Sequence, residues 1–464
     1  MRKNSVQSLN FKLSGLFAIA SAMLLPSAAH AVPIAIIDSG TALEHPDLVN
    51  HSWTNIYDWE DGVDNDDNGY IDDVHGWNFA DGSNKLYNKK LLGTFSPDVY
   101  KFFDVQTRVL EGKATADDKA WIAAHRGDKD FIAQLEAFGN FVHGTHVAGI
   151  ASKDSPGAQI MPLKVIGGAS SVLFKNALYA PRLMDDGDST KEKIVEVALG
   201  VLAAAQGSAL APMAQYASFE GAKVANCSFG SSAAPIRALI GPLISKFLGH
   251  ALTDSELDHY VRLFLEKASD SMRDHFVGAA TDTLFVIAAG NDGTNNDLMP
   301  TVPANVKADN SMTVAATTGV SSLASFSNYG ELTVDVAAPG VGILSSIPGD
   351  AHLTLSGTSQ ATPFVTNVAG RIRDVGPNLT IPQVKEIIFG TVDHKDFLQG
   401  KVATAGVVNP ARAVLAAQLM VARGSMDDAI ATARAQVPDM VETLPRAAIQ
   451  LDSLYVTPLM PLVQ

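Results

Sequence analysis

The sequence predicts an α/β protein whose central sheet is mainly parallel. The prediction depends on two observations: short apolar runs that end in glycine, asparagine or serine, and helical patterns that lie between these runs. Apolar runs without alternation are typical of strands that are buried on both faces, as in a parallel sheet covered by helices. The expected strands are residues 34–37, 160–166, 224–229, 284–289 and 312–316.

Helices are expected where capping residues precede apolar residues at helical spacing. Thr253 and Glu256 form a capping-box pair, and the apolar residues that follow recur every three or four positions. Later helices are expected to begin after Thr380 and after Asn409, each with a proline near its first turn, and a short last helix is expected from Ser425. Strands and helices therefore alternate along the chain, as a parallel α/β sheet requires.

The composition restricts both the class of protein and its partners. The chain has 464 residues, of which 47% are hydrophobic and 18% charged, so it is long enough to bury a large core in one or two domains. It carries 34 basic and 49 acidic residues, which give a net charge of -15. Because an acidic surface repels polyanions, no nucleic-acid partner and no anionic membrane partner is expected.

Residues 1–31 predict a signal peptide, because basic residues precede an apolar stretch and a small-x-small cleavage site that ends at Ala31. An uncleaved anchor is the alternative, since apolar character continues to Ile37. Pro26 and Pro33 interrupt that run, however, and its last residues are needed as a strand. We therefore expect export to the periplasm or the extracellular space, with no membrane span in the mature chain.

Three separated segments supply the groups of a catalytic triad. Ser359 stands between Gly357 and an apolar, helical run, which makes it a candidate nucleophile. A serine hydroxyl needs a neutral imidazole to take its proton and a carboxylate to hold that imidazole, and His143 and Asp38 suit these roles. Asn291 offers an amide to the developing oxyanion, with the backbone N–H of Ser359 as its partner.

The positions of these residues along the chain support a shared site. Asp38 follows one expected strand and Asn291 follows another. Ligands of parallel α/β sheets bind outside the carboxyl ends of the strands, so we expect both side chains at the same edge.

With these motifs in the order Asp, His, Ser, the chain resembles the subtilisin-like serine proteases, the subtilase family, over roughly residues 34–417 apart from insertions. The resemblance implies a three-layer α/β/α subtilisin-like fold with a mainly parallel central sheet and helical insertions. It favours His143 over His146 as the base. It also implies two segments that flank the pocket for the side chain before the scissile bond. These segments consist of Ser228, Phe229, Gly230, Ala288, Ala289 and Gly290.

The activity implied by the resemblance is that of an exported serine endopeptidase, which hydrolyses protein or peptide substrates through an acyl-enzyme on Ser359. The chain departs from the family near that serine. Gln360 replaces a common methionine, Thr362 a small residue and Phe364 a common histidine. These changes surround the nucleophile without removing it, so activity is expected while specificity is open.

The expected organisation is a signal peptide, a peptidase domain over 32–424, and a C-terminal tail over 425–464 whose role the sequence does not indicate. The tail is a candidate inhibitor or folding aid. Only six residues, 32–37, precede Asp38 in the predicted mature chain, so the N-terminal chaperone propeptide common in the family is not expected. Three insertions relative to the family are expected at about 81–139, 167–220 and 231–283.

An acidic run predicts a calcium site. Asp64, Asp66, Asn68 and Asp72 place oxygen ligands around a glycine turn, much as an EF-hand loop does. The twelfth position counted from Asp64 is His75, so the bidentate glutamate of an EF-hand is missing. The alternative is a solvated acidic turn. Calcium is the one cofactor expected, and no organic cofactor is.

Two other classes of protein could contain parts of this pattern. A catalytically idle binding or scaffolding protein would keep the motifs while its insertions block the cleft. A serine esterase of the α/β-hydrolase type requires glycine two residues after the nucleophile, where this chain has Ala361, and a different triad order. The esterase is therefore disfavoured, whereas the idle protein remains the alternative.

Overall fold

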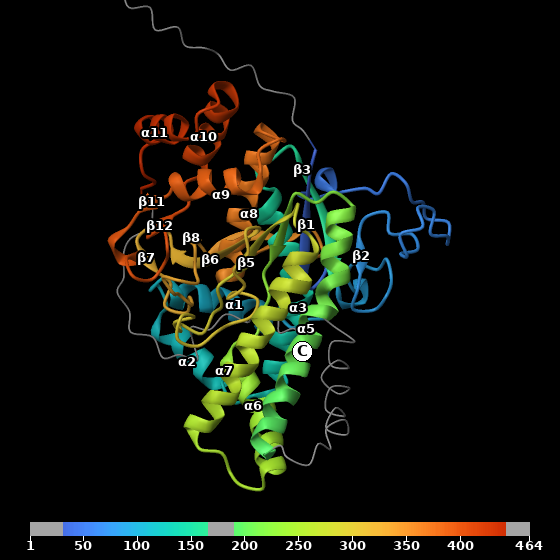
Figure 1. Ribbon diagram of the computed structural model, residues 1–464, viewed down its shortest axis with the longest axis vertical. Coiled ribbons are helices and arrows are strands. Elements are labelled where there is room, and N and C mark those ends of the chain that lie inside the picture. Colours follow the sequence, from blue (N-terminus) through green and yellow to red (C-terminus); the bar gives the residue numbers. More distant parts are fainter. Residues whose placement is uncertain (1–30, 166–189, 442–464) are drawn as a thin grey trace, which may run out of the picture.

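The computed structural model describes residues 31–165 and 190–441. Its centre is a ten-stranded sheet in the order β11-β12-β8-β6-β5-β4-β1-β3-β2, with β7 paired to β6 (Figure 1). The strands are β1 (Val32–Asp38), β2 (Trp77–Asn78), β3 (Ala158–Lys164), β4 (Val224–Cys227), β5 (Leu284–Ala288), β6 (Ser311–Thr318), β7 (Ser322–Leu323), β8 (Val336–Pro339), β11 (Asp393–His394) and β12 (Gly406–Val407). The remaining pair, β9 (Ile343–Ile347) and β10 (Ala351–Leu355), forms an antiparallel hairpin.

The central pairings are parallel, as the sequence predicts. In the middle of the sheet, Ile37 of β1 is in register with Cys227 of β4, which is in register with Ile287 of β5. β3 and β4 end two residues before the expected boundaries at 166 and 229. The chain turns away there, although Val165 still donates a hydrogen bond to the carbonyl of Asp38. Antiparallel pairing within the sheet involves β7 and β11.

Helices cover both faces of the sheet, which confirms the three-layer fold. Alternate strand residues such as Ala225 and Phe285 face a core shared with α5, α6 and α7, while Val224 and Leu284 face a second core shared with α8, α9 and α10. The helices are α1 (Pro97–Leu110), α2 (Ala116–His125), α3 (Lys129–Ser152), α5 (Lys191–Phe219), α6 (Ala233–Leu248), α7 (Asp254–Ser271), α8 (Thr358–Val375), α9 (Ile381–Gly390), α10 (Pro410–Arg423) and α11 (Met426–Gln436).

The capping residues identified in the sequence open the helices as expected. Thr253 and Glu256 form a capping box at α7, where the Thr253 N–H donates to the glutamate at 2.8 Å. Thr380, Asn409 and Ser425 accept hydrogen bonds at the starts of α9, α10 and α11. Short-range capping chemistry therefore fixes these boundaries.

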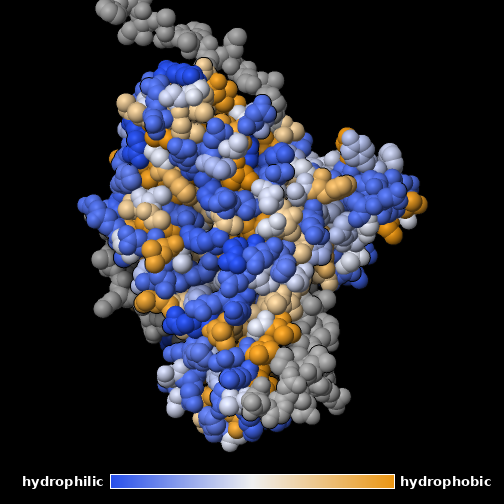
Figure 2. Space-filling model, in the orientation of Figure 1, coloured by the Kyte–Doolittle hydropathy of each residue, from blue (hydrophilic) through white to orange (hydrophobic). Residues whose placement is uncertain are grey.

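The expected insertions consist largely of helices. α1 and α2 occupy the first, α5 the described part of the second, and α6 and α7 the third, while residues 167–189 lie outside the described part of the chain. α5, α6 and α7 form a projection below the sheet (Figure 1). Hydrophobic side chains lie on its surface (Figure 2), among them Val197 and Val201 of α5 and Leu239, Leu243 and Phe247 of α6.

α5 is also the one helix in residues 31–165 and 190–441 that is long and apolar enough to cross a membrane by length and composition. It packs along one side into the core that it shares with α7, through residues that include Leu199, Leu210 and Met213. Core helices of globular proteins pass the same test of composition, so this helix is weak evidence for a membrane span.

The first insertion ends inside a helix rather than before one. α3 runs without a break from Lys129 to Ser152, so the helix that begins in the insertion continues through Gly139 to the candidate base His143. Asp128 caps its start by accepting hydrogen bonds from two backbone N–H groups. No proline interrupts this sequence, so the helix has no local reason to end at 139.

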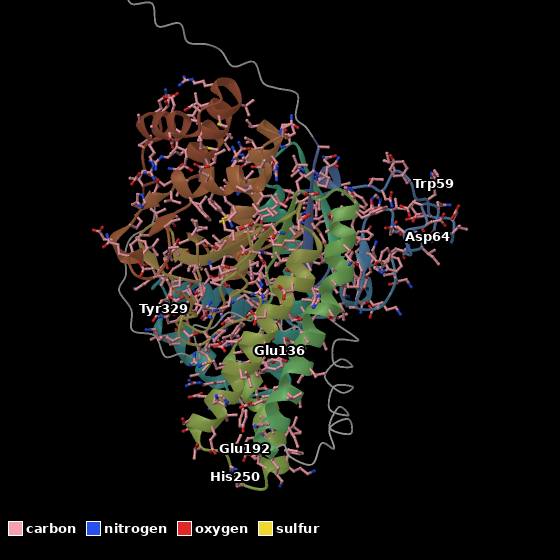
Figure 3. The ribbon with its side chains drawn as sticks, viewed as in Figure 1. Trp59, Asp64, Glu136, Glu192, His250 and Tyr329 are labelled. Atoms are coloured by element: carbon pink, nitrogen blue, oxygen red, sulfur yellow. The ribbon has the colours of Figure 1, made fainter. Side chains whose placement is uncertain are left out.

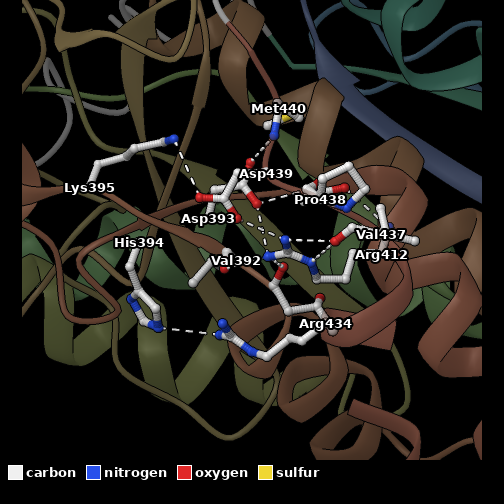
Figure 4. Close-up of polar contacts among 12 residues, drawn as sticks. Val392, Asp393, His394, Lys395, Arg412, Arg434, Val437, Pro438, Asp439 and Met440 are labelled. Carbon is white, nitrogen blue, oxygen red and sulfur yellow. Dashed lines mark hydrogen bonds and ion pairs between the residues drawn. The ribbon is translucent and has the colours of Figure 1, made fainter. Parts of the chain in front are cut away.

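The chain after α11 is tied to the sheet edge by a buried ion pair (Figure 4). Arg412 of α10 lies 2.9 Å from Asp393 of β11, and both side chains are almost completely buried. Arg412 also donates hydrogen bonds to the carbonyl of Val437 and to the carboxylate of Asp439, at 2.9 and 2.8 Å. The Met440 N–H donates to Asp393 at 2.7 Å. Residues 437–440, the first part of the expected tail, thus complete this network.

Candidate active site

Three adjacent strands end at the same edge of the sheet and carry the candidate residues. β1 ends at Asp38, β4 leads directly into Ser228, and β5 leads into the turn that contains Asn291. Because β4 lies between β1 and β5, these carboxyl ends are neighbours. The structure therefore brings together the strand-end residues that the sequence singles out.

Asp38 and His143 form a close, buried pair. The Oδ1 atom of Asp38 lies 2.7 Å from Nδ1 of His143, and it also accepts a hydrogen bond from the Ser39 N–H at 2.7 Å. An ionised carboxylate can only accept, so this contact places the imidazole proton on Nδ1 and leaves a lone pair on Nε2. That Nε2 atom is buried and has no hydrogen-bond partner.

Ser359 lies in the first turn of α8, directly after the β10 strand and Gly357. Its hydroxyl donates to the carbonyl of Ser228 at 3.2 Å, while the Ser228 hydroxyl donates to the carbonyl of Ser359 at 3.0 Å. The Ser359 hydroxyl is thus aimed at the end of β4 rather than at His143. Rotation about its Cα–Cβ bond re-aims the oxygen without moving the helix.

Asn291 is held by the residue that precedes Ser359. Its side-chain oxygen accepts hydrogen bonds from the N–H and from the hydroxyl of Thr358, both at 2.9 Å. With the oxygen fixed in this way, the amide nitrogen is the free end, and it is buried without a hydrogen-bond partner. The Ser359 N–H lies in the first turn of α8, where no preceding helical turn supplies it with an acceptor. The arrangement can therefore receive a developing negative charge.

The two segments expected to flank the substrate pocket lie beside this site, with little side chain exposed. Ser228, Phe229 and Ala289 are completely buried, and Gly230 and Gly290 are buried as well. The Gly290 N–H donates to the Thr358 hydroxyl at 3.2 Å, which ties this segment to α8. Any contact of these segments with a peptide would therefore be made mainly by their backbone.

Gly290 itself requires the absence of a side chain. Its φ is +112°, and a Cβ atom there would lie 2.4 Å from the side-chain nitrogen of Asn328. Asn328 in turn accepts hydrogen bonds from the N–H groups of Asp292 and Thr294. The turn after β5 that presents Asn291 is therefore specified by a glycine and a buried asparagine.

His146 has a structural position. Its Nε2 atom lies 3.0 Å from the carbonyl of Leu353 and 3.1 Å from that of Ile343, so it joins α3 to the β9–β10 hairpin. Complete burial lowers the pKa of His146 to about 3. The contact with the Leu353 carbonyl raises this pKa, but its effect is smaller than that of burial. His146 is therefore neutral and bonded internally.

The residues that depart from the family motif lie inside the protein. Gln360 is 2% exposed, and the Thr362 hydroxyl donates to the carbonyl of Thr358 at 2.8 Å. Phe364 packs against the core between α8 and the sheet. Their bulk is thus accommodated beneath the site.

A large cleft lies next to the segment that follows Asp38. Its volume is about 1010 Å³, and it is lined by Thr41, Leu43 and the segment 84–90. Within that segment, the Leu86 carbonyl approaches Gly40 so closely that a Cβ atom at Gly40 would lie 2.0 Å from it. The first insertion therefore reaches the neighbourhood of Asp38.

The acidic run forms a loop that projects from the side of the molecule, where Figure 3 labels Trp59 and Asp64. All four expected ligands accept hydrogen bonds from the loop backbone: Asp64 from the Gly69 N–H and Asp72 from the Gly62 N–H, both at 2.8 Å, Asp66 from the Asn68 N–H at 3.3 Å, and Asn68 from the Tyr70 N–H at 2.9 Å. Asp66 and Asn68 also contact a partly buried polar cluster.

Asn68 joins side chains of this cluster that come from distant parts of the sequence. Its side-chain nitrogen lies 3.2 Å from Asp66, 3.1 Å from Asp73 and 3.3 Å from Glu220 at the end of α5. Asn55 donates to Asp66 and to Asp73 at 2.9 and 3.0 Å. Burial raises the pKa of Asp73 to about 6 and that of Glu220 to about 7.

An oxygen-rich cluster that could hold a cation therefore lies beside the expected ligands and shares Asp66 and Asn68 with them. Asp73 belongs to the same acidic run and is buried, whereas the adjacent Asp72 is half-buried. Glu220 gave no such signal, because it lies 152 residues from Asn68 in sequence.

Comparison with known proteins gives one family. The model of the subtilase family matches residues 29–409. The chain is 30% identical over 252 residues to a thermophilic serine proteinase of Bacillus sp. (strain AK1), a match that covers 54% of this chain and 47% of the relative. It is 30% identical over 251 residues to thermitase of Thermoactinomyces vulgaris, covering 54% of this chain and 67% of thermitase.

A third relative is the extracellular protease of Xanthomonas campestris pv. campestris, which is 36% identical over 160 residues, or 32% of this chain and 26% of the relative. The chain spans less than half the length of several of the curated relatives that it matches.

Proposed function

The chain belongs to the subtilase family, and on this premise we propose that it is an exported serine endopeptidase that hydrolyses peptide bonds through an acyl-enzyme on Ser359. The observation that carries the proposal is the buried contact of 2.7 Å between Asp38 and His143. A carboxylate that fixes the imidazole tautomer in this way leaves a basic Nε2 atom for a serine proton.

The first half of the reaction begins when Ser359 leaves the Ser228 carbonyl and turns toward His143. As the Ser359 oxygen forms its bond to the scissile carbonyl carbon, its proton moves to Nε2 of His143. The pair of electrons of the carbonyl double bond moves to the carbonyl oxygen. The carbon–nitrogen bond then breaks, and the imidazolium gives its proton to the departing amine. Water repeats these steps on the acyl-enzyme and releases the acid.

Asn291 stabilises the charge that forms on the carbonyl oxygen. Its side-chain nitrogen supplies one hydrogen bond, and the backbone N–H of Ser359 supplies the other. Because Thr358 already holds the Asn291 oxygen, the amide does not have to reorient during the reaction. Such preorganised donors act most strongly where water is excluded, and the Asn291 side chain is buried.

The substrate is a protein or peptide in an extended conformation. Ser228 to Gly230 and Ala288 to Gly290 offer backbone rather than side chains, so main-chain pairing supplies much of the binding and a side-chain pocket the specificity. Release of the Ser228 carbonyl by the Ser359 hydroxyl frees one acceptor close to the scissile bond.

A fluorophosphonate probe tests the nucleophile directly. We expect the full-length secreted protein to gain one covalent adduct, on the peptide that contains Ser359, and to lose it in Ser359→Ala. Ser208→Ala is the matched control, since Ser208 is an exposed serine of α5, and labelling should be unchanged there.

Labelling that persists in Ser359→Ala would refute the assignment. The absence of labelling in a wild-type protein with a native circular dichroism spectrum would instead favour the catalytically idle binding or scaffolding protein.

Export is proposed from the N-terminal sequence, since residues 1–30 lie outside the described part of the chain. The extracellular protease of Xanthomonas to which the chain is similar supports it. Cleavage after Ala31 leaves Val32, the first residue of β1, at the new N-terminus. N-terminal sequencing of the protein from periplasm and medium should read Val-Pro-Ile, whereas retention of the first 31 residues would contradict the proposal.

We also propose that the acidic loop binds calcium, now with Asp66, Asn68, Asp73 and Glu220 as the residues whose oxygens would hold it. Their carboxylate and amide oxygens are the donors that Ca²⁺ prefers. They lie close together around Asn68, and Asp73 is buried while the other three are half-buried. A bound cation would offset the repulsion between these carboxylates and join the loop to the end of α5.

Thermal melts of the Ser359→Ala protein with and without a calcium chelator test this site. We expect chelation to lower Tm in the parent and to have a much smaller effect after Asp66→Asn. Glu136→Gln, which changes an exposed carboxylate on α3 (Figure 3), should respond as the parent does. An equal response of the parent and Asp66→Asn would exclude calcium at this loop.

A further inference from the structure

Three metal-ligating side chains that the proposed mechanism does not use meet at one place: His45, Asp47 and His352. His45 and Asp47 lie in the segment after Asp38, and His352 lies on β10, the strand that leads to Ser359. Nε2 of His352 is 2.7 Å from Oδ2 of Asp47, and Nδ1 of His45 is 3.8 Å from the same oxygen. One ligand atom from each residue lies within 4.8 Å of the other two.

His45 is held in the form that binds a metal. Its side chain is 1% exposed, and Nε2 lies 3.1 Å from the carbonyl of Ala351, to which it can only donate. The ring proton is therefore on Nε2, and Nδ1 is an unprotonated acceptor, which at present receives the Asp47 N–H at 3.1 Å. Metal-binding histidines commonly donate their second ring N–H to a backbone carbonyl in this way, which fixes tautomer and orientation.

Asp47 is also supported by a neighbour. The Ser346 hydroxyl donates to Oδ2 of Asp47 at 2.7 Å, which orients the carboxylate and lowers its pKa together with the nearby His352. Asp47 and His352 are each about half exposed, at 49% and 46% of their side-chain surface. A cation can therefore enter from solvent, and water can complete its coordination.

We propose that His45, Asp47 and His352 form a binding site for a divalent transition-metal cation, with Zn²⁺ as the type case. Two imidazole nitrogens and one carboxylate oxygen are donors that suit zinc, whereas calcium takes oxygen ligands. On binding, the metal replaces the Asp47 N–H at His45 and the His352 N–H at Asp47. The bound ion joins the segment after Asp38 to the hairpin before Ser359. This site is separate from the oxygen-only cluster around Asn68.

Isothermal titration of the full-length Ser359→Ala protein with Zn²⁺, in buffer with saturating Ca²⁺, tests the site. We expect one tight site for each chain. His352→Ala removes a direct ligand, and loss of even an outer-shell partner weakens metal affinity about 10- to 100-fold, so a loss of at least about 100-fold is expected. Because the His352 side chain is about half exposed, we expect this variant to fold, and circular dichroism checks it.

His259→Ala is the matched control, because His259 is another exposed imidazole that faces a single carboxylate, Glu196 at 3.4 Å. Zinc affinity should be unchanged in it. A second variant, Asp47→Asn, keeps an acceptor for Ser346 but removes the charged ligand, and should also weaken binding. The proposal is overturned if the parent binds no Zn²⁺, or if His352→Ala and Asp47→Asn bind it as tightly as His259→Ala does.

Discussion

Among single residues, Asn291 shows how a candidate catalytic side chain is oriented by hydrogen bonds from one neighbouring residue. Two hydrogen bonds from Thr358 hold the side-chain oxygen, and Thr358 is also the first residue of the helix that carries Ser359. The proposed donor and the proposed nucleophile are therefore fixed by adjacent residues. We therefore expect a substitution at Thr358 to disturb the positions of both Asn291 and Ser359.

Asn291→Asp separates the two roles of this residue. The new carboxylate still accepts from Thr358, but the second oxygen cannot donate to an oxyanion. We expect kcat to fall about 100- to 1000-fold, with KM changed much less, because the lost interaction belongs to the transition state. Steady-state kinetics on a peptide substrate measures both constants. Asn295→Asp makes the same charge change four residues away, and an equal loss there would point to electrostatics alone.

His146 predicts a pH dependence of stability. Its pKa is lowered to about 3 in the folded chain and is near 6.5 in an unfolded one. Between these values the unfolded chain binds a proton that the folded chain does not, so the free energy of unfolding falls as pH drops below 6.5. From pH 7 to pH 5 the contribution is about 2 kcal/mol.

Urea unfolding of Ser359→Ala at pH 7 and pH 5, with and without His146→Asn, measures this contribution. The variant is expected to be less stable at pH 7, because it loses the contacts with Ile343 and Leu353, yet to lose less stability on acidification. An equal loss in both proteins between pH 7 and pH 5 would contradict the assignment.

Among the helices and strands, the edge formed by β11, β12 and α10 depends on one buried ion pair. Arg412 and Asp393 are both almost completely buried, and Arg412 also binds the chain at Val437 and Asp439. A buried charge that loses its partner is far more costly than an exposed one.

Arg412→Ala is therefore expected to lower the free energy of unfolding by about 3–5 kcal/mol, because it leaves Asp393 buried and unpaired. Arg423 also lies on α10, and its exposed side chain pairs with Asp428 of α11. Arg423→Ala should lower the free energy of unfolding by no more than about 1 kcal/mol. Urea denaturation of the two variants in the Ser359→Ala background gives the comparison. An equal fall in the free energy of unfolding for both variants would show that the buried pair stabilises the protein no more than the exposed pair does.

Local patterns were enough to predict the capped helices and the apolar strands. α7, α9, α10 and α11 begin at residues whose side chains cap their own backbone, a signal contained within four positions. The continuity of α3 was not predicted, because the family resemblance divided its sequence at residue 139 into an insertion and the motif that contains His143. Helix formation depends on local sequence and not on this division.

Long-range contacts account for the rest of what sequence reasoning missed. Glu220 approaches Asn68 only because α5 crosses to the side of the sheet where the acidic loop lies. His352 approaches Asp47 only because the β9–β10 hairpin packs beside the segment after Asp38. Asp38, His143, Asn291 and Ser359 were grouped into one predicted site despite such separations, because the family resemblance supplied the association that spacing alone does not contain.

For the molecule as a whole, the C-terminal region divides into a part with defined contacts and a part outside the described residues. Residues 437–440 complete the network around Arg412, while residues 442–464 are not described. The role of the tail, including inhibition or assistance in folding, stays a prediction, but its two parts can be tested separately.

Two truncations make this test. A chain that ends at Val441 keeps the contacts of α11, Val437 and Asp439, and we expect its Tm to match that of the full chain. A chain that ends at Gly424 loses them and should melt at a lower temperature. Peptidase activity of both proteins should be measured in parallel, because a rise in activity on truncation at Val441 would identify residues 442–464 as inhibitory. Equal melting of the two truncations would contradict the structural role of residues 425–441.

α3 has a further consequence, for the ways in which this protein could diversify. One uninterrupted helix carries Phe131 and Leu135 of the insertion at one end and His143 at the other. Each residue added or removed between them would rotate one end relative to the other by about 100°, since a helix has about 3.6 residues per turn. Lineages that lengthen or shorten this segment must therefore do so in near-whole turns, or place the change in the loops before Asp128.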